Sequence, residues 1–151
     1  PLVPLGAALV HGAFNFLILL AALAWTGHLT LSVVLYPLML LPLLLLALGF
    51  SWFIAAWGVF IKDMSQIVPP FMQMLMFLSP VFYPASAAPG ILGPLFQYNP
   101  LGNIIESCRN VALGHPVDWT AWSASLLISL ATAWLGRTFF RRSREEFPDA
   151  L

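Results

Sequence analysis

Two uninterrupted apolar runs constrain the fold of this chain more than any other feature. Residues 5–25 give about 21 uncharged positions in a row, and residues 31–61 give about 31, where roughly 20 apolar residues suffice to cross a bilayer as an α-helix. Only 8% of the chain is charged, whereas soluble domains carry roughly a quarter of their residues as charged side chains. Too few charges remain to cover a water-exposed surface, so we expect a membrane protein.

The spacing of these runs predicts an all-α, polytopic membrane bundle. We expect four transmembrane helices, near residues 5–25, 34–61, 67–83 and 119–140. Residues 84–118 are interrupted by proline and glycine, so they are expected to form an external segment with a re-entrant or interfacial helix. Residues 141–151 form a polar tail. Because the chain opens on proline and not on methionine, we interpret residues 1–151 as the C-terminal part of one transmembrane domain of a longer protein.

A charged turn separates the second and third expected spans. Lys62 and Asp63 are adjacent in an otherwise uncharged stretch. Ser65 is expected to cap the following helix, with Pro69 and Pro70 in or near its first turn, where proline costs least.

Polar and aromatic side chains recur at helical intervals within the expected spans. His11 and Asn15 share a face of the first span, and helix–helix hydrogen bonding is a more common role for such groups than transport. Phe53, Trp57 and Phe60 recur on one face of the second span. Such a stripe usually serves packing or an interfacial belt, and a sugar-stacking surface is the less common alternative.

The external region contains one amphipathic pattern. The apolar positions fall on one helical face, whereas Glu106 lies elsewhere and can reach Arg109 at i+3. The apolar face consists of Leu101, Ile104, Ile105, Cys108 and Ala112.

The basic residues predict the orientation, because positive charge marks the cytoplasmic side. In the four-span arrangement Arg109 alone falls on one side. The other basic residues fall on the opposite side: Lys62, Arg137, Arg141, Arg142 and Arg144. We therefore expect both ends of the chain and the Lys62 turn in the cytoplasm, and residues 84–118 outside.

Motifs for catalysis are missing from the sequence. It has no phosphate-binding loop, no H-E-x-x-H, no G-x-S-x-G and no close carboxylate pair. The single Cys108 excludes an internal disulfide, and a net charge of zero gives no reason to expect a nucleic-acid partner. We expect a non-catalytic chain without a metal or cofactor of its own.

Residues 62–84 resemble the permease subunits of type-2 ABC exporters, most closely the branch that exports lipid-linked polysaccharides such as O-antigen, capsule and teichoic acid. A full-length subunit of that family has six spans, so the resemblance covers about the last four. The matching positions are Lys62-Asp63, Gln66, Pro69, Ser79-Pro80-Val81-Phe82-Tyr83-Pro84, Asn99-Pro100-Leu101 and Arg109.

The resemblance implies a role for each part of the chain. Two permease chains would pair around a channel in the bacterial inner (cytoplasmic) membrane, in contact with membrane lipid and a lipid-linked glycan. Separate ATP-binding subunits would supply ATP and magnesium. The implied coupling residues are Lys62, Asp63, Ser65 and Gln66; the channel-lining candidates are Phe53, Trp57, Phe60, Phe71, Gln73, Phe77 and Tyr83; and the exit segment contains Asn99, Pro100, Glu106 and Arg109.

Two alternatives remain at this point. The first is a type-2 ABC permease for another cargo, such as a drug or a small lipid. The second is a membrane scaffold or assembly factor that transports nothing.

Overall fold

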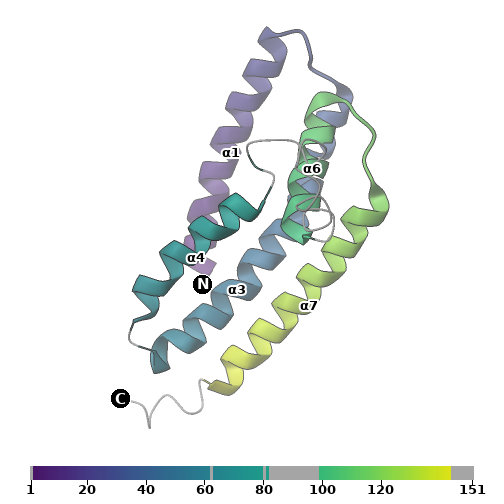
Figure 1. Ribbon diagram of the computed structural model, residues 1–151. Helices are drawn as coiled ribbons and strands as arrows, with labels where there is room; N and C mark the ends of the chain where they lie inside the picture. Colours follow the sequence, from purple (N-terminus) through teal and green to yellow (C-terminus); the bar gives the residue numbers. More distant parts are fainter. Residues whose placement is uncertain (1, 62, 80, 82–98, 144–151) are drawn as a thin grey trace.

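A computed structural model describes residues 2–61, 63–79, 81 and 99–143, and this part of the chain contains helices and no strand (Figure 1). The all-α prediction is therefore confirmed for the described residues. The elements in chain order are α1 (Leu2–Trp25), the 3-10 helix η1 (Leu31–Leu35), α2 (Tyr36–Met39), α3 (Leu41–Phe60), α4 (Met64–Leu78), α6 (Pro100–Leu113) and α7 (Trp119–Ser143).

Length and composition support two of the expected spans. Val3–Trp25 and Leu31–Phe60 are the 2 described runs long and apolar enough to cross a membrane. Helix α4 is apolar but has only 15 residues. Helix α7 has 25 residues but does not belong to this apolar class.

The second expected span is divided into three helical pieces. A 3-10 turn, Leu31–Leu35, leads into α2, and a break at Leu40 separates α2 from α3. Pro42 stands at the start of α3, where it has no N–H to donate to a carbonyl one turn earlier. Pro37 and Pro42 lie in the first turns of α2 and α3, so the prolines mark where the helical pieces of this run begin.

The predicted start of α4 also needs correction. The helix begins at Met64 with Asp63 as its N-cap residue, so Ser65 lies inside the first turn and is no cap. Pro69 and Pro70 consequently fall in the second turn. The helix ends at Leu78, earlier than the expected boundary at residue 83.

Helices α3 and α7 pack closely through two glycines. A Cβ added to Gly49 would lie 2.7 Å from the backbone carbonyl carbon and oxygen of Thr132, and one added to Gly136 would collide with the carbonyl oxygen of Gly49. Phe53 and Phe139 extend this contact, with ring centroids 5.6 Å apart. Small residues at a helix crossing allow this close backbone approach, which is typical of membrane helices.

Serines continue the small-residue face of α7. Ser125 and Ser129 are fully buried, and each hydroxyl donates to a carbonyl four residues earlier in the helix, at 2.9 and 2.7 Å. Because these bonds are internal to α7, the polar groups need no partner from another helix.

Helix α6 packs against the short helical pieces near the α1 turn. Met39, Ile104, Cys108 and Val111 form one buried cluster, which confirms the inward face predicted for α6. A second cluster contains Leu23, Val33 and Ala112.

Figure 1 shows which turns lie at each end of the helical bundle. The turn between α3 and α4 and the C-terminal end of α7 lie at one end, and the turns after α1 and α6 lie at the other. Helix α6 runs along the bundle, not across it, and starts partway along its length. This direction differs from that of an interfacial helix, which lies in the plane of the membrane.

Candidate functional site

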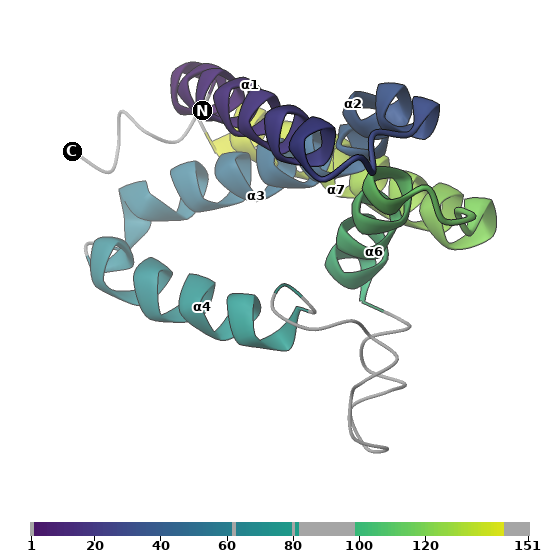
Figure 2. The ribbon, with the colours of Figure 1, turned by 90° about the horizontal axis from the view of Figure 1, so that it is seen from above.

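An apolar cleft separates α3 from α4. Its volume is about 370 Å³, and a smaller pocket of about 270 Å³ continues it as far as Leu101 of α6. Figure 2 shows α4 standing away from the close-packed α3–α7 pair. The larger part is lined by Phe50, Phe53, Ile54, Trp57, Met64, Ile67, Val68, Phe71 and Met72. Aromatic and aliphatic walls of this kind suit a hydrocarbon ligand.

The other face of α4 carries its polar side chains. Gln66 and Gln73 are seven residues apart, so they lie on one helical face two turns apart, and both are exposed. Phe77 is 63% exposed and lies beside them on the helix. None of these three residues lines the cleft toward α3.

The two adjacent prolines in α4 leave two backbone carbonyl oxygens without hydrogen-bond donors from the helix. Pro69 and Pro70 lie inside the helix and have no amide hydrogen to donate. The carbonyl oxygens of Ser65 and Gln66 therefore lack their usual partners one turn later. In a membrane such oxygens are tolerated only against protein or water.

Polar side chains of α6 meet the end of α4. The Asn99 side chain caps α6 by accepting the Leu101 N–H at 3.0 Å, and its amide nitrogen donates to the Leu78 carbonyl at 3.2 Å. Arg109 forms the predicted ion pair with Glu106 and donates to the Val81 carbonyl at 3.4 Å.

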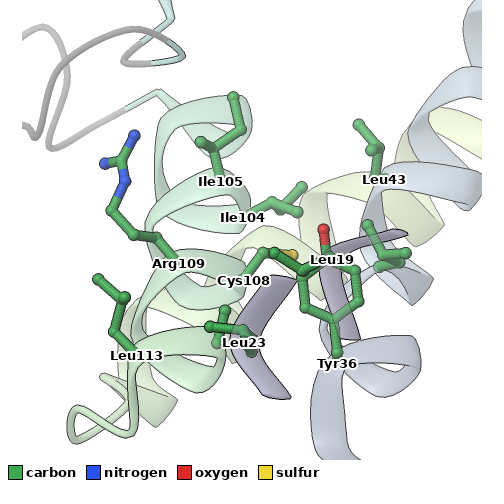
Figure 3. A pocket seen from close by; sticks show the side chains of 11 residues that line it. Leu19, Leu23, Tyr36, Leu43, Ile104, Ile105, Cys108, Arg109 and Leu113 are labelled. Carbon is green, nitrogen blue, oxygen red and sulfur yellow. The ribbon is translucent and has the colours of Figure 1, made fainter. Parts of the chain in front are cut away.

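A second pocket, of about 500 Å³, lies between α1, α2 and α6 (Figure 3). Leu19 and Leu23 of α1 line it together with Tyr36 and Cys108, while Arg109 extends away from Tyr36. Cys108 is 8% exposed, so its thiol is shielded from solution by the surrounding side chains.

The structure brings some of the predicted channel residues together and separates others. Phe53, Trp57 and Phe71 converge on the α3–α4 cleft. Gln73 and Phe77 lie on the opposite face of α4. Phe60, at the end of α3, is half exposed and lines neither part of the cleft, and Tyr83 lies outside the described residues.

The remaining predicted site residues fall into two groups. Asp63, Ser65 and Gln66 are exposed at the α3–α4 turn, and Lys62 lies outside the described residues. The exit-segment residues Asn99, Pro100, Glu106 and Arg109 belong to the α6 cap and its first three turns. The Leu78 and Val81 carbonyls were missed as partners, because a backbone acceptor leaves no mark in a side-chain pattern.

These features define a helical protein with long apolar helices, in which the N-terminal end of α6 is hydrogen-bonded to the end of the short apolar helix α4. A family model described as "ABC-2 type transporter" matches residues 2–113. The chain belongs to this family of membrane transport subunits.

A curated relative agrees with this assignment. The chain is 26% identical over 138 residues to the O-antigen export system permease protein RfbA of Myxococcus xanthus. The match covers 89% of this chain and 53% of that protein, so the chain spans about half the length of this relative. A search of the solved structures found no significant match. The comparisons confirm the predicted resemblance to type-2 ABC permeases of the O-antigen branch.

Proposed function

We propose that this chain is part of the permease of an ATP-driven exporter that moves a lipid-linked polysaccharide across the bacterial cytoplasmic membrane. Family membership and the similarity to a permease named for O-antigen export support this cargo class. A separate subunit would hydrolyse ATP with magnesium, because the sequence contains no phosphate-binding loop.

The proposal rests on the contrast between the polar face and the apolar face of α4. Gln66 and Gln73 are exposed on one face, whereas the face toward α3 is wholly apolar. Polar side chains on a membrane helix are stable only against protein, water or a polar ligand. Two copies of the chain with these faces opposed would enclose a polar path, and the exposed ring of Phe77 would offer a surface for sugars.

The α3–α4 turn is the proposed contact for the ATP-binding subunit. Asp63, Ser65 and Gln66 are exposed there, at the end of the bundle that also holds the C-terminal end of α7. A cytoplasmic position of this end follows from the basic residues Lys62 and Arg137. A short turn joining two helices passes displacement directly into both.

One observation favours a second cargo class. The larger part of the α3–α4 cleft presents no polar surface, which suits a small lipid or an apolar drug better than a sugar chain. This part of the cleft would then be the transport site, and the polar face of α4 would only contact protein.

Co-purification tests the proposal first. The protein is extracted from its native membrane in mild detergent, and an ATP-binding subunit is expected in equal amount. Its absence, under conditions that preserve a known transporter complex, would refute the ATP-driven reading and favour a scaffold.

Matched variants then separate the two cargo classes. Gln73→Leu is expected to lower glycan export several-fold, whereas Met74→Leu, a neighbouring exposed position on α4, is expected to have no effect. If Gln73→Leu exports normally while Phe71→Ala abolishes transport of an apolar compound, the second cargo class is correct.

A further inference from the structure

The C-terminal end of α4 leaves backbone carbonyls to be satisfied inside the membrane. Its 15 residues extend only about 22 Å, short of a hydrocarbon core of roughly 30 Å. The last four carbonyls of a helix have no partner within the helix. In a bilayer, water cannot replace those partners, so donors must come from protein.

Residues of α6 and its cap donate to one of these carbonyls and to a second carbonyl just beyond the end of α4. Asn99 donates to the Leu78 carbonyl at 3.2 Å while its side-chain oxygen caps α6, so one side chain joins the two helix ends. Almost three turns further along α6, Arg109 donates to the Val81 carbonyl at 3.4 Å, and its ion pair with Glu106 orients the guanidinium.

The rest of α4 is only weakly packed against its neighbours. None of its residues is buried, and its main neighbour, α3, lies across the apolar cleft. Helix α6, in contrast, is anchored by Ile104, Cys108 and Val111 in a buried cluster. The end of α4 is therefore tied to a firmly packed element, whereas its length is free to move against α3.

We propose that Asn99 and Arg109 form a latch that makes the end of α4 and helix α6 move as one body. A displacement that starts at Asp63, at the other end of α4, then reaches α6 directly. Asn99 and Arg109 act as positioning residues through the Leu78 and Val81 carbonyls. The transport consequence of the latch rests on the proposed function, but the mechanical link does not.

Distance measurements between spin labels test the link. One label pair is placed at Met74 of α4 and Leu113 of α6, and a control pair at Leu41 of α3 and Leu127 of α7, all exposed positions. The labels are introduced into a Cys108→Ala background, and the purified protein is studied in lipid nanodiscs without ATP or cargo.

The variant Asn99→Ser separates the latch from the helix cap. Serine caps a helix as well as asparagine does, but it lacks the amide that reaches Leu78. We expect the narrow α4–α6 distance distribution to broaden and shift in Asn99→Ser and in Arg109→Met, with the α3–α7 control unchanged. Glu106→Gln, which keeps the Arg109 donors, is expected to have a smaller effect.

An unchanged α4–α6 distribution in both Asn99→Ser and Arg109→Met would overturn the latch, whatever the cargo. A changed α4–α6 distribution supports the latch even if no ATP-binding subunit co-purifies with the protein. In that case the proposed function fails and the latch does not. A change that also appears in the α3–α7 control would overturn it too, because the variants would then act by general loosening.

Discussion

Gly49 and Gly136 set the distance between the two most closely packed helices of the molecule. Gly136→Ala would place a methyl group against the Gly49 carbonyl, and Gly49→Ala would place one 2.7 Å from the Thr132 backbone. The helices would have to separate, and overpacking of this kind costs about 1–3 kcal/mol. Thermal unfolding in detergent is expected to show a lower midpoint for both variants.

Gly58→Ala is the matched control on the same helix. No heavy atom lies within 4 Å of a Cβ built there. Because alanine favours a helix by roughly 0.5–1 kcal/mol relative to glycine, its midpoint should be unchanged or slightly higher. Equal losses at Gly58 and Gly136 would show that close packing is not the cause.

Gly114 is needed for its backbone conformation as well as for close packing. It ends α6 with a φ of 73°, and a Cβ there would lie 2.9 Å from the Thr30 methyl group. Gly27 has almost the same φ, 72°, but open space around it. Gly27→Ala is expected to cost about 1–2 kcal/mol from backbone strain alone. Gly114→Ala should cost more, and equal midpoints in thermal unfolding would exclude a role for the Thr30 contact.

The double proline makes α4 an unusual membrane helix. Pro69 and Pro70 lie in its second turn, and each costs roughly 3 kcal/mol relative to alanine inside a helix. The double variant Pro69→Ala/Pro70→Ala is expected to slow amide hydrogen exchange throughout α4. If the Ser65 and Gln66 carbonyls line the proposed polar path, export should fall at the same time.

Pro37→Ala provides the control for the proline variant. Pro37 occupies the first turn of α2, where a missing amide hydrogen costs little. Its exchange pattern and export should resemble those of the unaltered protein. Normal export by the Pro69→Ala/Pro70→Ala variant would show that the Ser65 and Gln66 carbonyls are not needed for transport.

The arrangement of the whole bundle predicts which residues lie on the same side of the membrane. Ser65 follows the α3–α4 turn and His115 follows α6, at opposite ends of the molecule, and both are exposed. With the proposed orientation, a membrane-impermeant maleimide should label His115→Cys in intact cells. It should label Ser65→Cys only after the membrane is permeabilised.

The native thiol provides a clean background for this experiment. Cys108 is buried, so a membrane-impermeant maleimide has little access to its thiol. Labelling of Ser65→Cys from outside intact cells would reverse the proposed orientation. Labelling of both positions from the same side would contradict the bundle itself.

Local patterns in the sequence were sufficient for several features. The apolar runs predicted an all-α membrane protein, and spacing alone predicted the inward face of α6 and the Glu106–Arg109 pair. Asp118, directly before α7, accepts the Thr120 and Ala121 amides at 3.0 Å, as aspartate commonly does at a helix N-terminus. These features depend on residues a few positions apart, which helical periodicity relates directly.

Features that depend on distant segments needed the tertiary structure. The close approach of Gly49 and Gly136 could not be predicted from either helix alone, because a helix crossing is decided by both helices. Phe71 lines the cleft and Phe77 does not, because the position of α3 decides which face of α4 borders the cleft. The bonds from Asn99 and Arg109 reach backbone carbonyls, whose positions are set by where α4 ends and not by residue type. Periodicity determines which side of a helix is apolar, and only packing determines what that side meets.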